Sequence, residues 1–255
     1  MLWYRSWLET RWRFVIGLVL LPLSAAGSVF AYPRLIKLLP LAAQVDPNDF
    51  IGQRVVEAAQ VMSTYRGYVW AQWFAQNMTQ QWTLFAVLLG TGGLLAQSSG
   101  GGALFTLSLP TTRDRLVGVR AATGLAELLV LALVPSLVLP LLSPAIGERY
   151  GVGDALMHAT FMFVGGSIFF SLAFFLSSVF SDVWRPLLIV ACAGAAVGFL
   201  EQVVEDFSRY SVFGLMSGEG YFRGEGVPWL GLVVSVVVSS LLLVAATRNI
   251  ARQDF

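Results

Sequence analysis

Six long apolar stretches take up most of this chain and leave few residues for anything else. A helix rises about 1.5 Å per residue, so it needs roughly 20 apolar residues to cross a hydrocarbon core of about 30 Å. Of the 255 residues, 56% are hydrophobic and only 12% are charged, whereas a soluble domain carries about 25% charged residues. The sequence therefore predicts an all-α membrane protein with six transmembrane helices, at Phe14–Tyr32, Trp82–Gln97, Leu116–Leu142, Ala155–Phe180, Pro186–Val204 and Trp229–Thr247.

The distribution of basic residues predicts how these helices are oriented. With the N-terminus inside, the inner segments carry nine arginines and four acidic residues, and the outer segments carry seven basic and nine acidic residues. An excess of arginine and lysine marks the cytoplasmic side. Because an even number of spans returns the chain to its starting side, we expect both termini in the cytoplasm of a multi-pass plasma (inner) membrane protein. A net charge of +1 gives no reason to expect a nucleic-acid partner.

The first residues, Met1–Arg13, have the composition of a helix that lies along the membrane surface. Tryptophans recur on one face while Arg5 and Glu9 occupy another, as in interfacial helices held at the headgroup level. The alternative is a cytoplasmic extension of the first span. A cleaved signal peptide fits poorly, since three tryptophans precede the apolar stretch. The candidate interfacial residues are Trp3, Trp7, Arg11 and Arg13.

Two outer segments are long enough to hold short extracellular helices. In Pro33–Thr79, Asn48 or Asp49 can cap a helix whose apolar residues recur along one face. An aromatic group follows it and suits the outer membrane interface: Tyr65, Tyr68, Trp70, Trp73 and Phe74. In Glu205–Val227, the apolar stretch Tyr210–Met216 is too short to span and predicts a short helix or a re-entrant piece resting on the bundle.

The segment between the second and third spans carries the strongest functional signal. A Gly100-Gly101-Gly102 hinge precedes the apolar residues Phe105, Leu107 and Leu109, and Pro110 then leads to a charged helix start. On the expected orientation this loop is cytoplasmic. Apolar residues exposed in a loop mark a surface for a partner. The alternative is that they fold back onto the bundle.

The whole layout resembles the permease subunits of ABC-2-type transporters. An aromatic and basic start, Trp3–Phe14, runs into the first span, the element Leu107–Arg113 follows the second, and the chain ends shortly after the sixth with Arg248–Phe255. The resemblance implies an exporter in which two permeases pair, as a homodimer or heterodimer, with two copies of an ABC ATPase subunit. It also implies that the ATPase binds a coupling loop comprising Phe105, Thr106, Leu107, Ser108, Leu109, Pro110, Arg113 and Arg115.

The chain itself has no sequence that could hydrolyse ATP. A P-loop requires Gly-x-x-x-x-Gly-Lys-Ser/Thr, and the only lysine, Lys37, lies between Ile36 and Leu38. We therefore expect no catalytic residue and no cofactor here, with ATP and magnesium bound by the partner ATPase. His158 is the only histidine, so we expect no metal site and interpret His158 as a polar interface residue.

Glu127 is the one acidic residue deep within a predicted span. A charged side chain at such depth costs a few kcal/mol unless it is paired or hydrated, so a functional role is the first hypothesis. We interpret Glu127 as a candidate for the translocation path. The alternatives are a structural hydrogen bond to a neighbouring span, or hydration from the inner side. Cys192 lies in an apolar run, and we expect it to be a small core residue.

The sequence thus predicts one ABC-2-type transmembrane domain over residues 1–255. Its parts are an interfacial helix (1–13), a six-span bundle (14–247) and a cytoplasmic tail (248–255). The predicted function is that of a permease subunit coupled to a separate ATPase. A secondary transporter, which ought to show inverted halves and interrupted helices, and a membrane scaffold or assembly factor are the competing hypotheses.

Overall fold

The structure is a computed structural model that describes residues 2–38, 50–92, 112–203 and 211–252. Within these ranges every regular element is a helix, and no strand occurs. The elements are α1 (Leu2–Leu35), α3 (Phe50–Met62), α4 (Tyr65–Tyr68), the π-helix η1 (Val69–Met78), α5 (Thr79–Gly90), α8 (Arg113–Leu142), the 3-10 helix η2 (Ser143–Ile146), α9 (Val152–Ser177), α10 (Trp184–Val203), α11 (Val212–Ser217), α12 (Glu219–Phe222) and α13 (Trp229–Ala251).

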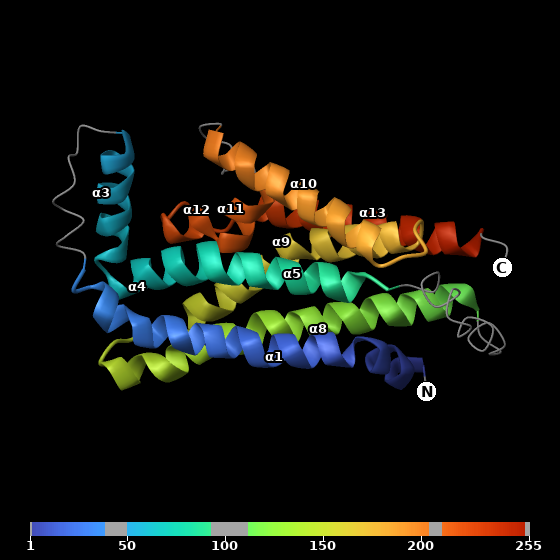
Figure 1. Cartoon of the computed structure of the whole chain (residues 1–255), viewed down its shortest axis with the longest axis horizontal. Coiled ribbons are helices and arrows are strands. Elements are labelled where there is room, and N and C mark those ends of the chain that lie inside the picture. Colours follow the sequence, from blue (N-terminus) through green and yellow to red (C-terminus); the bar gives the residue numbers. More distant parts are fainter. Residues whose placement is uncertain (1, 39–49, 93–111, 204–210, 253–255) are drawn as a thin grey trace.

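The long helices lie side by side along the longest axis of the molecule (Figure 1). The helix α9 is central, because it contacts α5, α8, α10, α11 and α13. Its buried residues lie on most of its circumference, from Ala155 to Ser177, as expected for a helix that is apolar all round. On the outside of the bundle, α1 packs chiefly against α8, and α13 packs chiefly against α9.

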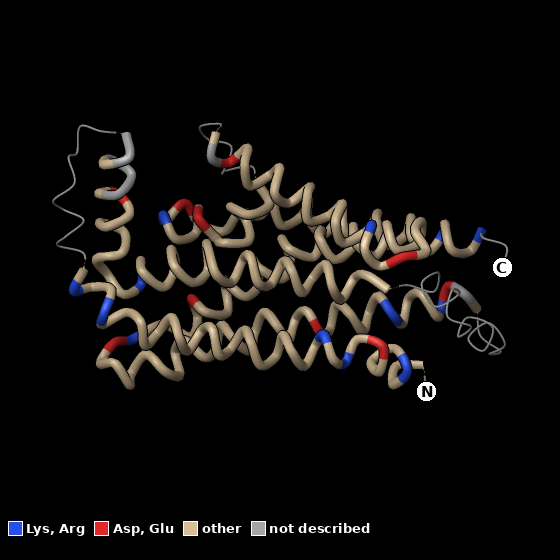
Figure 2. The backbone as a smooth tube through the Cα atoms, in the orientation of Figure 1, with Lys and Arg blue, Asp and Glu red and all other residues tan. Residues whose placement is uncertain are grey.

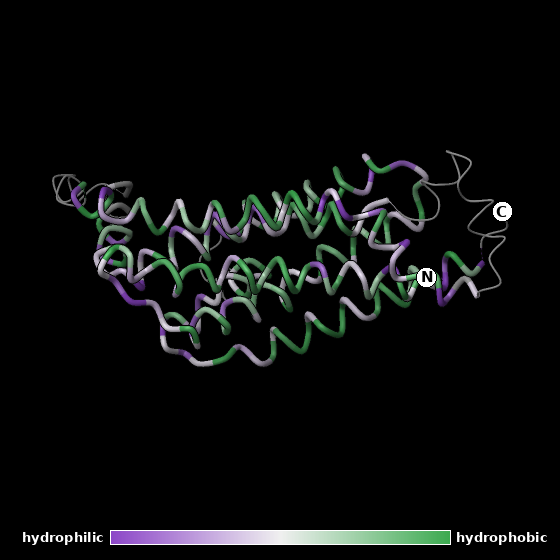
Figure 3. The backbone as a smooth tube through the Cα atoms, turned by 90° about the horizontal axis from the view of Figure 1, so that it is seen from below, coloured by the Kyte–Doolittle hydropathy of each residue, from purple (hydrophilic) through white to green (hydrophobic). Residues whose placement is uncertain are grey.

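Among the residues that the structure describes, five helices are long and apolar enough to cross a membrane: Leu2–Leu35, Asp114–Ile146, Val152–Ser177, Trp184–Glu201 and Trp229–Ala251. Most charged residues lie toward the two ends of these helices (Figure 2). Apolar residues dominate the length between the ends (Figure 3). Large apolar side chains also remain exposed on α1, α10 and α13, where only lipid or another apolar partner would cover them favourably. The chain is therefore a multi-pass, all-helical membrane protein.

The second predicted span is wrong in its bounds. The helix in this region ends at Gly90 rather than at Gln97, and residues 93–97 lie outside the described part of the chain. Before Trp82 the helix extends further than predicted, since α4, η1 and α5 follow one another without a break over residues 65–90. The aromatic group before Trp82 belongs to this helical run, so Tyr68, Trp73 and Phe74 are buried in the bundle and do not face the outer membrane interface.

The helix predicted for residues 1–13 is not a separate element, because α1 is one helix from Leu2 to Leu35. Its position at the membrane surface stays a prediction. The alternative, an extension of the first span, describes it better. Residues at intervals of three, four or seven along its whole length are buried, namely Ser6, Thr10, Gly17, Leu21, Ala25, Val29 and Tyr32. This stripe has the period of one helix face, so the first turns pack on the protein with the rest of α1.

Two short helices predicted in the outer segments are present, as α3 and α11. The helix α11 contacts α9, which agrees with a piece resting on the bundle. Two other predictions are wrong. His158 is only 2% exposed, because α11 and the aromatic residues of η1 cover it. Cys192 is exposed, because α10 lies at the periphery and contacts few other elements.

Candidate functional site

Polar contacts gather at one end of the bundle, which we call the basic end. There α1, α8 and α10 begin and α5, α9 and α13 end, so both termini lie at this end (Figure 1). A side-chain contact joins two of the helix ends, since the Asn249 side chain of α13 donates to the carbonyl of Ser178 at 2.8 Å. The inner arginines of the sequence are thus brought together at one end of the molecule.

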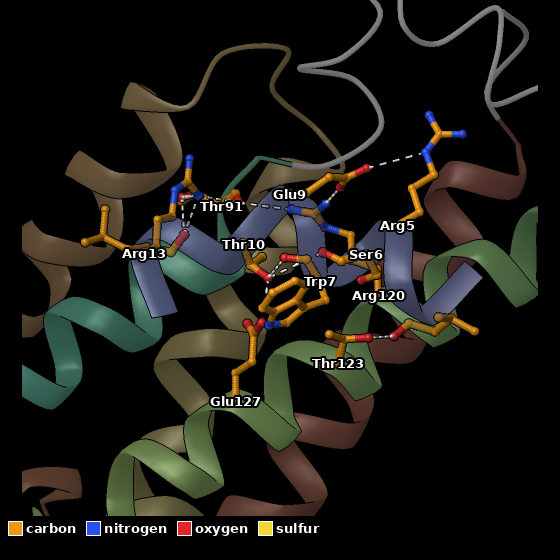
Figure 4. A network of polar contacts seen from close by, with 12 residues as sticks. Arg5, Ser6, Trp7, Glu9, Thr10, Arg13, Thr91, Arg120, Thr123 and Glu127 are labelled. Carbon is orange, nitrogen blue, oxygen red and sulfur yellow. Dashed lines mark hydrogen bonds and ion pairs between the residues drawn. The ribbon is translucent and has the colours of Figure 1, made fainter. Parts of the chain in front are cut away.

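Glu127 projects from α8 toward the first turns of α1 and is only 5% exposed (Figure 4). The Thr10 hydroxyl donates to Glu127 Oε1 at 2.7 Å. Glu127 Oε2 is buried and has no hydrogen-bond partner in the described part of the chain. A buried acceptor without a partner costs about 1–3 kcal/mol, and a charged one costs more. Glu127 therefore makes the structural hydrogen bond between spans that was one of the alternatives, and it keeps one oxygen free.

Two turns nearer the end of the bundle, Arg120 of α8 forms an ion pair with Glu9 of α1. The Arg120 side chain is only 11% exposed. Arg5 lies one turn before Glu9 on α1, with its Nε 4.0 Å from Glu9 Oε1. Arg120 is largely shielded from water, whereas Glu9 remains partly exposed, with 28% of its side chain accessible, so the attraction between them is weakened by solvent screening. The pair joins α1 to α8 beside the Thr10–Glu127 hydrogen bond.

Arg13 of α1 reaches the end of α5. Its Nη1 donates to the carbonyl of Leu88 at 2.6 Å, to the carbonyl of Thr91 at 3.0 Å and to the Thr91 hydroxyl at 3.3 Å. Arg120 Nη2 donates to the same Thr91 carbonyl at 3.2 Å. The last carbonyls of a helix have no partner within the helix and carry partial negative charge. Two arginines from two other helices satisfy them here.

The backbone turns sharply where these arginines meet it. Thr91 is extended (φ −81°, ψ 158°), and Gly92 has a φ of +90°, in the left-handed region that favours glycine. A Cβ on Gly92 would lie 3.5 Å from Arg13 Nη1 and 3.6 Å from Arg120 Nη2. The chain therefore leaves α5 between two guanidinium groups, directly before residues 93–111.

Most of the predicted coupling loop lies outside the described residues: Phe105, Thr106, Leu107, Ser108, Leu109 and Pro110. After it, Thr112 begins the next helix, and its carbonyl accepts from the backbone N–H groups of Arg115 and Leu116 at 3.1 and 3.2 Å. Arg113 is the first residue of α8, and Arg115 is exposed on it. Both described flanks of the loop are thus at the basic end.

The four candidate interfacial residues divide between two environments. Trp3 and Trp7 are 56% and 38% exposed, and the Arg11 guanidinium lies 5.5 Å from the centre of the exposed Trp12 ring. Arg13 instead faces inward, onto α5. The tryptophans and Arg11 are free to contact headgroups, whereas Arg13 belongs to the polar contacts inside the bundle.

Sequence reasoning identified Glu127 and Arg13 but missed their partners. Thr10, Glu9, Arg120 and Thr91 have no unusual sequence context, and backbone carbonyls carry no sequence signal at all. One hint was present, since Arg120 and Glu127 are seven residues apart and so share a helix face. Nothing in the sequence indicated that this face meets the start of α1.

Aromatic side chains dominate the opposite end of the bundle. The His158 ring stacks on Phe74 with centroids 4.3 Å apart, and its Nδ1 is 3.0 Å from the Ser217 carbonyl. Because a carbonyl only accepts, Nδ1 carries the hydrogen. Trp70 Nε1 donates to the same carbonyl at 3.1 Å. These contacts fix α11 on the bundle. Within the described ranges, no group of three or more His, Cys, Asp or Glu residues could hold a metal ion.

The contacts at the basic end hold three helices together and fix the end of α5, after which residues 93–111 follow. No nucleophile with an adjacent base lies among these described residues. No protein-family model, curated protein or solved structure matches this chain.

Proposed function

We propose that this chain is the permease subunit of an ATP-driven ABC transporter, an exporter, in which residues 93–111 bind a separate ATPase subunit. The observation that carries the proposal is the position of this segment. It follows Gly92 at the basic end, and Arg13 and Arg120 hold the residues directly before it, Leu88 and Thr91. A force applied to the segment would therefore act directly on α1, α5 and α8.

The proposal includes a sixth span made of α4, η1 and α5. Together they form an uninterrupted helical run of 26 residues, longer than the roughly 20 residues a span needs. With six spans both termini are cytoplasmic, and the basic end faces the cytoplasm of the plasma (inner) membrane. The arginines at this end support that orientation, because basic residues are enriched on the cytoplasmic side.

The ATP chemistry belongs to the partner in this proposal. A transporter of this kind contains two ATPase subunits, which bind ATP and magnesium, and a second permease that completes the translocation path. Support comes from the sequence, in which the single lysine excludes a P-loop. Glu127 is the candidate for the path within the present chain, because its Oε2 has no partner among the described residues.

The test is purification of the tagged chain from native membranes in mild detergent, followed by an assay of ATP hydrolysis. We expect a P-loop ATPase to co-purify with the wild type. Burying a phenylalanine side chain is worth about 1.5–3 kcal/mol. Phe105→Ala should therefore lower the amount of bound ATPase by about tenfold or more, without lowering the yield of folded permease.

Phe30→Ala is the matched control, since Phe30 is 52% exposed on α1 and far along the helix from the basic end. It should leave ATPase binding unchanged. A loss of folded permease on Phe105→Ala with ATPase binding intact would show that the ring packs within the permease. Transport by the purified chain under an ion gradient alone, with no ATPase present, would instead establish a secondary transporter.

A further inference from the structure

The end of α5 is held more firmly than a helix end exposed to water would be. Three of its acceptor atoms, the carbonyls of Leu88 and Thr91 and the Thr91 hydroxyl, receive hydrogen bonds of 2.6 to 3.3 Å from Arg13. Arg120 adds a bond of 3.2 Å to the Thr91 carbonyl. Hydrogen bonds from charged donors are about twice as strong as neutral ones. We call these contacts of Arg13 and Arg120 the arginine clamp.

Two like charges converge on one carbonyl in the clamp, so other groups must stabilise the arrangement. Glu9 forms the ion pair with Arg120, and the partial negative charge at the end of α5 attracts both guanidinium groups. Arg13 and Arg120 belong to different helices, α1 and α8. The clamp therefore does more than cap one helix, because it connects the end of α5 to two neighbours at once.

The two neighbours are themselves joined beside the clamp. Glu9 of α1 pairs with Arg120 of α8, and Thr10 of α1 donates to Glu127 of α8 at 2.7 Å. These links lie on successive residues of α1, so the start of α1 cannot move along α8 without breaking both. The first turns of α1, the first part of α8 and the end of α5 thus form one connected unit.

We propose that Arg13 and Arg120 are positioning residues, which fix the end of α5, directly before residues 93–111, to α1 and α8, so that a force applied at the end of α5 moves the three helices together. This inference rests on the proposed function, in which the force comes from a bound ATPase. Its structural part, that the arginines hold the end of α5, is independent of any partner and is tested separately.

The first experiment measures hydrogen–deuterium exchange of the backbone amides at residues 88–92 in the purified full chain without ATPase. Arg13→Gln and Arg120→Gln should each speed exchange there by about tenfold or more, because each variant removes at least one charge-assisted hydrogen bond worth about 1.5 kcal/mol or more. Arg11→Gln and Arg115→Gln are matched controls on the same two helices. Exchange that is equal in all four variants and the wild type would overturn the proposal.

The second experiment uses the chain reconstituted with its ATPase and MgATP. Arg13→Gln should leave the amount of bound ATPase and the KM for ATP unchanged, while the increase in kcat that the wild-type permease causes should fall at least about tenfold. Arg13→Lys, which keeps a charged donor at this position, should restore part of that increase and also guards against misfolding of the glutamine variant. A merely structural role would not move kcat with binding intact.

The outcomes separate the two proposals. If no ATPase binds the wild type, the proposed function fails, while the exchange experiment still decides whether the arginines hold α5. If Arg13→Gln abolishes ATPase binding, Arg13 takes part in docking, and the positioning role is overturned. If exchange rises but kcat keeps its response to the permease, the clamp holds α5 without transmitting movement, and the proposal is likewise overturned.

Discussion

A single threonine hydroxyl is the donor that the described residues offer to the Glu127 carboxylate. Thr10 is 3% exposed and Glu127 is 5% exposed, so water does not replace the hydrogen bond between them. Desolvating a carboxylate is expensive, and losing its partner adds to the cost. The stability of the α1–α8 contact therefore depends strongly on the Thr10–Glu127 hydrogen bond, which the sequence alone does not single out.

Thr10→Val tests this dependence, because valine has nearly the shape of threonine but cannot donate. We expect it to lower the free energy of unfolding by about 1–3 kcal/mol, measured by thermal unfolding in detergent. Thr160→Val is the control, since Thr160 is exposed and its hydroxyl bonds only within its own helix. In the Glu127→Gln background the effect of Thr10→Val should shrink. Equal effects in both backgrounds would show that the two residues are not coupled.

Glu127→Gln also tests the candidate path. If Glu127 acts on substrate, this variant should fold and bind ATPase normally but change substrate-stimulated ATP turnover. A Glu127→Leu variant that assembles and transports like the wild type would remove the residue from the path.

Tyr150, which lies between η2 and α9 outside the spanning helices, is protected from ionisation by burial. Burial is the main cause that raises the pKa of Tyr150 above the ordinary value of about 10. Because the pKa in the folded state is higher than in the unfolded state, the contribution of Tyr150 to stability is complete below about pH 10 and is lost as the pH rises above it.

Alkaline titration checks this expectation through the absorbance of tyrosinate. Tyr150, which is 8% exposed, should ionise only in a late phase, when the protein unfolds. Replacing Tyr150 by phenylalanine should remove one ionisation from the late phase. If the substitution instead removed an ionisation from the early phase of the titration, the Tyr150 ring would be in contact with water.

At the scale of the elements, the apolar pattern predicted four of the helices within a few residues. For α8, α9, α10 and α13, the predicted spans start no more than three residues from the observed helices. The length of each apolar stretch sets the bounds of these helices, so the bounds can be predicted from the sequence. The bounds of α1 and of the helix ending at Gly90 were wrong. Before Trp82, aromatic residues such as Trp73 and Phe74 belong to the helical run because the protein covers them. The first turns of α1 combine exposed tryptophans with the buried polar residues Ser6 and Thr10, so they continue the helix without being an apolar stretch.

The candidate site was less predictable than the helices. Glu127 and Arg13 stand out by charge. Their hydrogen-bond partners, Thr10 of α1 and Leu88 of α5, are each more than 70 residues away from them in sequence. Which faces of two helices meet depends on close packing. A single sequence indicates which face of a helix carries apolar or small residues, but not which neighbouring helix packs against that face.

The crossing of α5 and α9 depends on one missing side chain. A Cβ on Gly90 would lie 2.6 Å from the Phe170 carbonyl and 2.9 Å from the Ala173 Cβ. Both obstacles are fixed to the α9 backbone, so the helices must separate to admit a methyl group. Gly90→Ala should therefore lower the free energy of unfolding by about 1–3 kcal/mol.

Thermal unfolding in detergent measures this effect, with Gly153→Ala as the control. Gly153 is in α9, and a Cβ there would meet nothing within 4 Å, so alanine should be neutral or stabilising by up to about 1 kcal/mol. A Gly90→Ala protein as stable as the wild type would mean that the α5–α9 contact can widen without cost.

For the whole molecule, the proposed orientation makes a prediction about access from the two sides of the membrane. Single cysteines are introduced in a Cys192→Ser background, because the native thiol is exposed. Labels at Thr112 and Asp254 should resist an impermeant reagent applied outside intact cells, whereas labels at Gln60 and Glu225 should react. Gln60 and Thr112 are both exposed in the structure, so burial would not explain a difference.

The same labels applied to inverted vesicles provide the complementary control, since the pattern should reverse. If a cysteine introduced at Thr112 reacted from outside intact cells, the 93–111 segment would lie on the wrong side of the membrane for a cytoplasmic ATPase.

The pairing of α1 with α8 also has a consequence for the order in which the protein is made. The central helix α9 follows α8 in the chain, so the ribosome completes α1, α5 and α8 before α9 exists. The polar contacts described above between α1 and α8 involve only residues up to Glu127, and those of the arginine clamp involve only α1, α5 and α8. The buried charges of this region can thus find their partners early in membrane insertion, before the later helices arrive to enclose the core.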